Sequence, residues 1–189
     1  IVKNYSDINL DKHDTVIHTA SPNHSKCENL SIFNSYVDDT KRLIKKSLDA
    51  QVANFIFTSS TRIYGDNLKG SIDEMTPIVI DDNYSIMKHE IEKTLLNCNS
   101  LNSCIVRISN GYGWPLTKES NCWDLLGMYI AKTITKFNVI KIKSNGRQYK
   151  DFIPISFAVQ NLIDIVNHPS MYPNILNLSA GKSSTVKDF

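Results

Sequence analysis

Hydrophobic residues in this chain occur in two patterns, short continuous runs and longer stretches with helical spacing. The continuous runs are rich in β-branched residues and end in small or polar ones, which is typical of buried strands. They cover residues 14–20, 54–60, 104–110 and 175–179. In the other stretches, apolar positions recur three and four residues apart, which predicts helices. These cover residues 33–48, 84–98, 123–137 and 157–166.

The order of these elements predicts the fold class. Strands and helices alternate, so each strand–helix–strand step is expected to be a right-handed crossover between parallel strands. Residues 139–143 alternate between apolar and polar positions and predict a short exposed strand. The pattern favours an α/β protein with a doubly wound, mostly parallel sheet and helices on both faces.

Composition and charge narrow the function classes. At 189 residues and 41% hydrophobic, the chain is expected to form one domain with a real core. Its 21 basic and 19 acidic residues leave a formal charge of +2, which does not suggest a nucleic-acid or membrane partner. We expect no membrane span, because no apolar stretch reaches about 18 residues, and a cytoplasmic location, because no signal peptide opens the chain.

The cysteines and histidines do not indicate a metal or disulfide site. The four cysteines lack a C-x-x-C spacing, so they are interpreted as reduced thiols. The five histidines are scattered without the spacing of metal ligands. We therefore expect no metal.

The most informative chemistry lies between residues 54 and 88. The strand at 54–60 ends in Ser59 and Ser60, and Tyr84 and Lys88 follow one helical turn apart on a stripe of otherwise apolar residues. A free tyrosine has a pKa near 10, and a fixed cation within about 4–6 Å lowers it toward the range of a useful base. The alternative is a surface tyrosine and lysine that share a spacing by chance.

Ser60, the segment Ile63-Tyr64-Gly65 and the Tyr84-x-x-x-Lys88 spacing resemble the extended short-chain dehydrogenases/reductases, the NAD-dependent epimerase/dehydratase family. The resemblance implies a Rossmann-like fold and NAD as cofactor, with NADP possible. It implies that Tyr84 accepts a proton from the substrate, and that Lys88 binds the cofactor ribose and lowers the pKa of Tyr84. Ser60 would hydrogen-bond the reacting oxygen, and Ser59 would line the cofactor.

Two further strand ends match the family. By position, Thr19, Ala20 and Ser21 would lie along the nicotinamide half of the cofactor, although small residues also suit an ordinary strand exit. The segment around residues 107–115 is similar to the family's "RxxNxYGP" segment. This implies that Ser109 touches the cofactor and Asn110 binds the substrate, the alternative for Asn110 being a turn former before glycine.

Residues 147–155 are similar to the family's "RDFIxVxD" segment, whose arginine holds the nucleotide diphosphate. Here Lys150 replaces that arginine, which keeps the charge but loses the bidentate fork, and Arg147 is a second candidate. The alternative is a solvated basic patch. In the helix at 33–48, Tyr36 stands where the family usually has an asparagine near the nicotinamide, so one cofactor contact is in doubt.

The resemblance also narrows the reaction. Dehydratases of the family commonly place an Asp-Glu pair just after the residue matching Ser60, whereas this chain has Thr61 and Arg62, and arginine stays protonated. We therefore expect a nucleotide-sugar epimerase of the 4-epimerase type. The alternatives are an NADP-dependent ketoreductase of the same family and a non-catalytic dinucleotide-fold sensor or scaffold. The family's helix pairing implies a homodimer.

One hallmark of the family is missing. The seven glycines nowhere form the G-x-x-G-x-x-G turn that holds a dinucleotide pyrophosphate. We therefore expect residues 1–189 to be a single partial dinucleotide-binding domain, truncated at the N-terminus and in the C-terminal substrate lobe, to which residues 111–155 contribute. On this expectation, the chain alone binds NAD weakly or not at all and is inactive.

Overall fold

The chain forms two compact units in its computed structural model. The structure describes residues 5, 8–11, 13–66, 68, 70–117, 123, 125–140 and 144–189. Unit 1 consists of Ile1–Arg107 and Ile165–Asn177, and unit 2 of Ile108–Asp164 and Leu178–Phe189.

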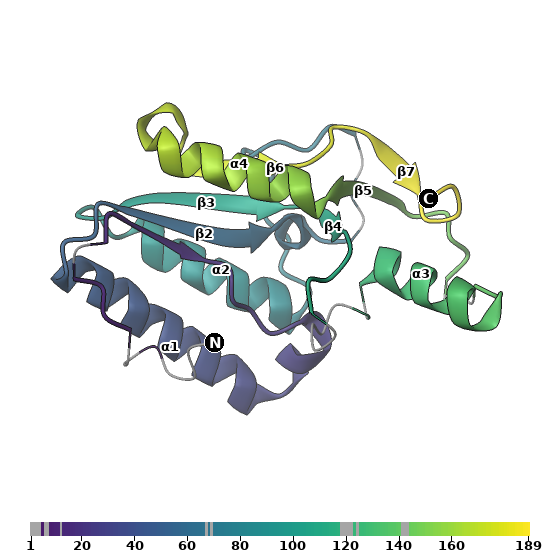
Figure 1. The fold of residues 1–189 in the computed structure, drawn as a ribbon, viewed down its shortest axis with the longest axis horizontal. Helices are drawn as coiled ribbons and strands as arrows, with labels where there is room; N and C mark the ends of the chain where they lie inside the picture. Colours follow the sequence, from purple (N-terminus) through teal and green to yellow (C-terminus); the bar gives the residue numbers. More distant parts are fainter. Residues whose placement is uncertain are drawn as a thin grey trace. The chain divides into compact units, whose positions relative to one another are not determined.

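A parallel sheet forms the centre of unit 1. Its strand order is β1 (Thr15–His18), β2 (Asn54–Ser60), β3 (Asn102–Ile108) and β6 (Ile175–Leu178), so β1 is an edge strand. β1 and β2 pair in parallel, with Thr15 opposite Asn54. The amides of Ile105 and Ser109 donate to carbonyls four residues apart in and next to β6, which is the spacing of a parallel pair. Figure 1 shows β1, β2 and β3 side by side.

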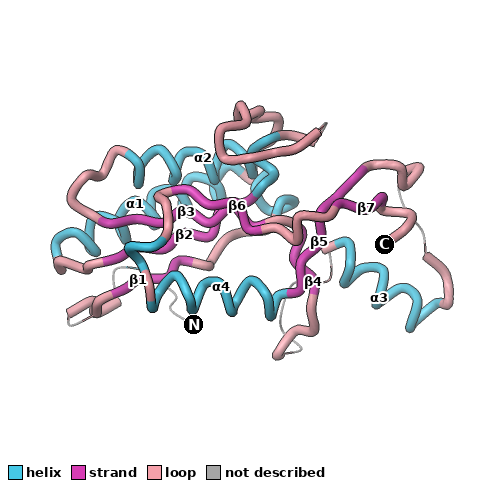
Figure 2. The backbone as a smooth tube through the Cα atoms, turned by 90° about the horizontal axis from the view of Figure 1, so that it is seen from above, coloured by secondary structure: helices cyan, strands magenta, loops and turns pink. Residues whose placement is uncertain are grey.

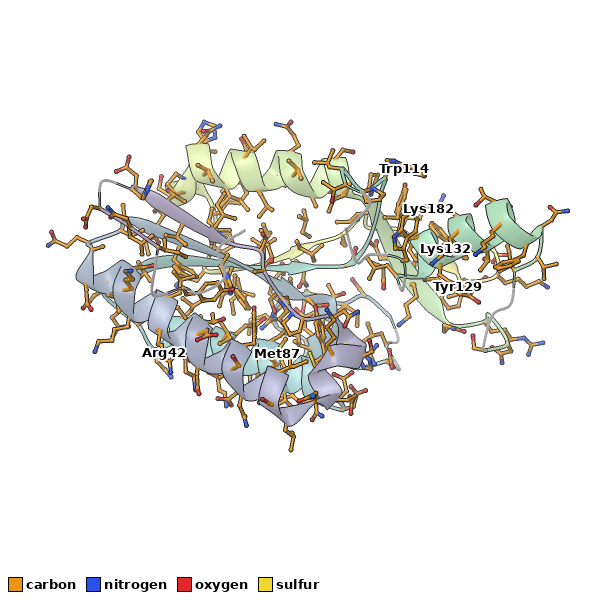
Figure 3. The ribbon with its side chains drawn as sticks, turned by 60° about the horizontal axis from the view of Figure 1, so that its bottom comes forward. Arg42, Met87, Trp114, Tyr129, Lys132 and Lys182 are labelled. Atoms are coloured by element: carbon orange, nitrogen blue, oxygen red, sulfur yellow. The ribbon has the colours of Figure 1, made fainter. Side chains whose placement is uncertain are left out.

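Two helices cover one face of this sheet (Figure 1). They are α1 (Leu30–Asp49) and α2 (Asn83–Leu96), which also pack on each other. Asn29 caps α1 and Asp82 caps α2, each accepting backbone N–H groups that have no partner within the helix. The side chains between the helices and the sheet are almost completely buried, among them Phe55, Phe57 and Met87, the last of which is labelled in Figure 3.

Unit 2 contains a smaller sheet and most of two helices (Figure 2). The sheet order is β4 (Asn110–Tyr112), β5 (Tyr149–Pro154) and β7 (Ser183–Thr185); β4 pairs in parallel with β5, and β5 antiparallel with β7. The helices are α3 (Leu126–Phe137) and α4 (Ile155–Asn167), whose last three residues belong to unit 1. Phe152 and Phe189 stack with their ring centres 3.8 Å apart.

The part of the chain that the structure describes also contains three labelled 3₁₀ helices. They are η2 (His24–Glu28), η3 (Thr61–Tyr64) and η4 (Pro169–Met171). Asn23 caps η2 and Ser60 caps η3 through their side-chain oxygens. The second of these caps places the end of β2 and the start of η3 in one fixed turn.

The predicted fold class is confirmed, and most predicted elements are found close to their expected bounds. The strand predicted at 104–110 is wrong in one respect, because the chain leaves the strand at Ser109 and β4 joins a different sheet. Residues 139 and 140 are not in a strand; 141–143 lie outside the described residues, as does 124 within the predicted helix 123–137. β5 and β7 were not predicted as strands. The division into one domain with a lobe at 111–155 stays a prediction; that range lies within unit 2.

The described residues contain neither a helix that could span a membrane nor a cluster of metal ligands. Among them, no helix combines the length and apolar character needed to cross a bilayer, and no group of three or more candidate ligands could hold a metal ion. Cys27, Cys98 and Cys104 are free thiols, and Cys122 lies outside the described part of the chain.

Candidate catalytic site at the ends of β1 and β2

The candidate site lies within unit 1, where β2 ends and α2 begins. Ser60 is the last residue of β2, and its Oγ accepts the amide of Arg62 at 3.2 Å. Tyr84 and Lys88 are on the first two turns of α2. A capping box between Asp82 and Ser85 fixes that end of the helix, because each side chain satisfies the other residue's backbone N–H.

The hydroxyl groups of three residues converge at Tyr84. Burial raises the pKa of the Tyr84 phenol, and hydrogen bonding with the side chains of Ser60 and Ser21 lowers it only in part. Ser60 comes from the end of β2 and Ser21 from the loop after β1. The side chains of Ser60 and Ser21 thus both act on the pKa of the Tyr84 phenol, and the catalytic role of Ser60 and Tyr84 stays a prediction.

Lys88 is deeply buried beside these groups. Its Nζ donates to the carbonyl of Thr58 at 2.8 Å and lies 4.9 Å from the centre of the Phe57 ring and 5.6 Å from that of Tyr84. The side chain is 2% exposed. Burial lowers its pKa to about 7, against the opposing effects of Cys27 and Glu92. Near pH 7, both the neutral and the protonated form of the Lys88 amine are therefore populated.

The expected lowering of the Tyr84 pKa is not found. The pKa of Tyr84 is raised, with burial as the largest cause. The physical reason is that Lys88 loses part of its own charge when buried and directs its Nζ to Thr58. Proximity of an amine alone does not make this phenol acidic.

The end of β1 supplies the second wall of the site. Thr19, Ala20 and Ser21 are exposed there. Tyr36 of α1 donates its hydroxyl to the carbonyl of Ala20 at 2.9 Å and lies 3.3 Å from Nε2 of His18. Tyr36, at the position where the family usually has asparagine, therefore holds the loop after β1 through a hydrogen bond to its backbone.

Ser59, predicted to line the cofactor, is turned inward. Its hydroxyl donates to Oε1 of Glu92, which in turn binds Arg107. Glu92 and Arg107 form an ion pair in which both side chains are at most 2% exposed. Sequence reasoning missed this pair, although an acid four residues after Lys88 and an arginine within a buried strand were signals for it.

Arg62 has a structural partner that the sequence did not reveal. Its Nε donates to Asp82 at 2.5 Å, and its two terminal nitrogens bind Asp66 at 3.2 and 3.1 Å. His24 also approaches Asp82, at 3.3 Å. Arg62 therefore supports the cap of the helix that carries Tyr84.

The remaining predicted residues lie in unit 2. Ser109 donates its hydroxyl to the carboxylate of Asp151 at 2.7 Å, and the side-chain amide of Asn110 donates to the Asp151 carbonyl at 2.9 Å. The same carboxylate accepts the backbone amides of residues 180 and 182. Arg147 is exposed, and Lys150 is half-buried on β5. Ser109 and Asn110 thus have internal partners.

Comparison with known proteins identifies a sequence family. The family described as "NAD dependent epimerase/dehydratase family" matches residues 6–178, which is most of the chain. No curated protein matches the sequence at a significant level.

Several solved structures share the fold. UDP-N-acetylglucosamine 4-epimerase from Methanobrevibacter ruminantium M1, solved with UDP-N-acetylmuramic acid, is 23% identical, with a TM-score of 0.81 over 100% of this chain and 63% of its own. The UDP-glucuronic acid 4-epimerase from Bacillus cereus, solved as a mutant with a UDP-sugar analogue and NAD, is 16% identical, with a TM-score of 0.86 over 100% and 62%.

A dehydratase is equally similar in fold. The NAD-dependent NDP-hexosamine 5,6-dehydratase TunA, involved in tunicamycin biosynthesis, is 22% identical, with a TM-score of 0.83 over 98% of this chain and 60% of its own. At these identities the likeness shows the fold alone. The chain spans about 60–63% of the length of these three structures.

Proposed function

The chain belongs to the NAD-dependent epimerase/dehydratase family, and on that basis we propose that the protein acts as an NAD-dependent nucleotide-sugar epimerase of the 4-epimerase type. One observation carries the proposal. Hydrogen bonding with the side chains of Ser60 and Ser21 acts on the phenol of Tyr84, and the buried Nζ of Lys88 lies 5.6 Å from the centre of its ring. That arrangement is suited to moving one proton to and from a substrate hydroxyl.

The donors at this site fit the nicotinamide and ribose half of NAD. An ammonium group has three N–H donors, and Thr58 accepts one from Lys88, so Lys88 can also donate to ribose hydroxyls. Thr19, Ala20 and Ser21 offer small, exposed surface beside it. When bound, NAD would take up and then return the two electrons of the sugar carbon. The seven glycines of the chain do not form the glycine-rich turn that binds a pyrophosphate, so we assign no residue of this chain to the pyrophosphate of NAD.

The positions of Tyr84 and Ser60 suggest the role of each residue in the proposed reaction. Tyr84 accepts the proton of the sugar C4 hydroxyl and later returns it, while Ser60 hydrogen-bonds the same oxygen. Because burial keeps the Tyr84 phenol protonated at neutral pH, its use as a base requires added positive charge. A protonated Lys88 and the cationic nicotinamide ring would provide that charge.

The residues after Ser60 favour epimerisation over dehydration. Arg62 stands where dehydratases carry an acid, and its guanidinium is bound to Asp82 and Asp66. It cannot act as a general acid or base. The nucleotide-sugar substrate is proposed by analogy with the two similar 4-epimerase structures, which contain UDP-sugars. Arg147 and Lys150 are the proposed contacts to its diphosphate, and α1 and α2 the proposed dimer interface.

The test is C4 inversion. The full-length gene product is incubated with UDP-glucose and NAD, and formation of UDP-galactose is followed by NMR. Tyr84→Phe should lower the rate about 100- to 10,000-fold, the usual contribution of a general base. Tyr149→Phe removes the hydroxyl of an exposed tyrosine and should leave the rate unchanged. A Tyr84→Phe variant with the full rate would refute the role of Tyr84.

The same assay separates the alternatives. Net consumption of NADPH without inversion would identify a ketoreductase. Binding of NAD without either reaction would identify a sensor or scaffold, which the raised pKa of Tyr84 and the presence of Tyr36 favour.

A further inference from the structure

Three ionisable side chains lie on successive turns of α2, at residues 84, 88 and 92. A spacing of four residues places them on one face of the helix. Lys88 and Glu92 are 2% and 1% exposed, respectively. Tyr84 and Lys88 belong to the proposed catalytic site, whereas Glu92 has no role in it so far.

The carboxylate of Glu92 is bound from two strands. Arg107 of β3 donates from Nε at 3.2 Å and from Nη2 at 2.7 Å, and Ser59 of β2 donates its hydroxyl to Oε1. Two parallel hydrogen bonds from one guanidinium fix the carboxylate in position as well as in charge. Since Ser59 precedes Ser60, Glu92 ties the end of β2 to the helix of Tyr84 and Lys88.

Arg107 extends these contacts to the other side of the site. Its Nη1 donates to the Tyr64 hydroxyl at 2.8 Å, and that hydroxyl donates to Asn177 at 2.8 Å. Tyr64 ends η3, which begins directly after Ser60. The pair therefore connects β2, η3, α2, β3 and β6 within unit 1.

Stability alone does not account for this pair. Removing two charges from water is costly, and well-packed apolar residues of similar volume are often as stable or more stable. A second buried cationic side chain, that of Lys88, lies one helical turn from Glu92 and is almost completely shielded from solvent. The Glu92 carboxylate opposes the effect of burial on the pKa of Lys88.

Few other titratable groups face Lys88. His18 of β1 and Cys27 of η2 interact with it electrostatically, and Tyr84 lies above it on α2. β2 contributes only the Phe57 ring and the Thr58 carbonyl. Burial raises the pKa of Cys27 to about 11 and lowers that of His18 to about 4, so both are neutral at pH 7. Glu92 is thus the acidic side chain among these groups that favours the protonated form of Lys88.

We propose that Glu92, held by Arg107, is a positioning residue that keeps Lys88 protonated and fixes the Ser59–Ser60 strand end against α2. The inference rests on the proposed function in one respect, namely that Lys88 is the cation of the site. Glu92 acts through Lys88 and Ser59 and does not itself touch the reacting atoms.

The test measures the protonation of Lys88 directly. Lysine carrying ¹³C at Cε is incorporated, the Lys88 resonance is assigned by its loss in Lys88→Met, and its shift is followed against pH. In Glu92→Gln the pKa of Lys88 should fall by about 1 unit or more, because burial is then no longer opposed by a nearby carboxylate. Glu90→Gln is the matched control, since Glu90 lies on the same helix but pairs with Lys93 and Lys41 at the surface. It should leave the titration unchanged.

A second variant guards against misfolding. Glu92→Leu combined with Arg107→Met removes both charges together, so no unpaired charge stays buried. Lys88 should still show a fall in pKa, smaller than in Glu92→Gln because the positive charge of Arg107 is removed as well. An unchanged Lys88 titration in this folded double variant would overturn the proposal. Loss of folding in both variants would also overturn it, because the pair would then be structural only.

The outcome is separable from that of the proposed function. The titration requires neither NAD nor turnover. Failure of the full-length gene product to bind NAD, measured by calorimetry, would refute the proposed cofactor role even if Lys88 still responds to Glu92. An unresponsive Lys88 in a protein that binds NAD would refute only the role of Glu92.

Discussion

Burial in the fold opposes the protonated form of Lys88, the form that the proposed chemistry requires. Its amine is buried 4.9 Å from the centre of the Phe57 ring, although an amine needs polar partners. The fold provides one carbonyl, that of Thr58. Burial of an amine favours its neutral form, which is why the pKa falls to about 7.

This conflict predicts a pH dependence of stability. Between the folded pKa of about 7 and the model value of 10.5, the unfolded chain binds a proton at Lys88 that the folded chain does not. The free energy of unfolding therefore rises with pH across that window, by about 1.4 kcal/mol for each unit that separates the two pKa values. At and below pH 7 the cost of burying the amine is present almost in full.

Lys88→Met should remove this cost. The variant is expected to be more stable than the parent at pH 7, and the difference should narrow between pH 7 and pH 9. Urea unfolding at both pH values measures it, with Lys93→Met as the control because Lys93 is half exposed on the same helix. Parallel pH profiles of Lys88→Met and the parent would show that Lys88 does not titrate in this range.

At the scale of elements, the N-terminus of α2 depends on Arg62. Burial by itself raises the pKa of Asp82, but the Ser85 amide and Arg62 outweigh it and hold that pKa below its usual value. A lowered carboxylate pKa contributes stability above the unfolded value of 3.8, and that contribution is lost as the pH falls through the folded pKa.

Arg62→Met should therefore lower the free energy of unfolding by about 1–2 kcal/mol at pH 7, the range of a charge-assisted hydrogen bond to a helix cap. Arg42→Met is the control. Arg42, labelled in Figure 3, pairs with Asp39 on exposed α1 surface, and such pairs contribute at most about 1 kcal/mol. Urea unfolding at pH 7 measures both. An effect of Arg62→Met no larger than that of Arg42→Met would contradict the role of Arg62, and below pH 3.8 the effect should shrink.

Elements defined by a repeating pattern could be predicted from the sequence. The apolar run that forms β2 and the helical spacing of α2 placed Ser60, Tyr84 and Lys88 correctly in their elements. The direction of the Lys88 amine could not be predicted, because it depends on a carbonyl 30 residues earlier in the chain.

Elements defined by distant contacts were missed. The sequence of residues 104–110 does not mark where the strand ends, yet the chain changes sheets at Ser109, whose side chain binds Asp151. β7 has only three residues, so no periodicity could reveal it. The hydrogen bond from Arg62 to the capping residue Asp82 joins positions 20 residues apart in the sequence. The Glu92–Arg107 pair joins a helix residue to a strand residue 15 positions later.

At the scale of the whole molecule, the two units differ in how much core they contain. The main hydrophobic cluster lies entirely in unit 1, where it includes Phe55, Phe57, Ile91 and Ile105. In unit 2, most of the large apolar side chains of α3 and α4 have substantial exposure. The proposed catalytic groups of β2 and α2 therefore belong to the better packed unit.

This difference predicts two levels of protection from hydrogen exchange. Local opening is easiest where few apolar contacts must be broken, so amides of α3 and β5 should exchange at a lower opening free energy than those of β2 and α2. Native-state exchange followed by NMR measures both sets. Asp151→Asn should weaken protection in β5, because Asp151 joins the segments around residues 109 and 180. It should leave β2 unchanged, since Asp151 contacts no residue of that strand in the described structure. Equal loss of protection in β2 and β5 would show that the two units unfold together, and the candidate site would then depend on unit 2 for its stability.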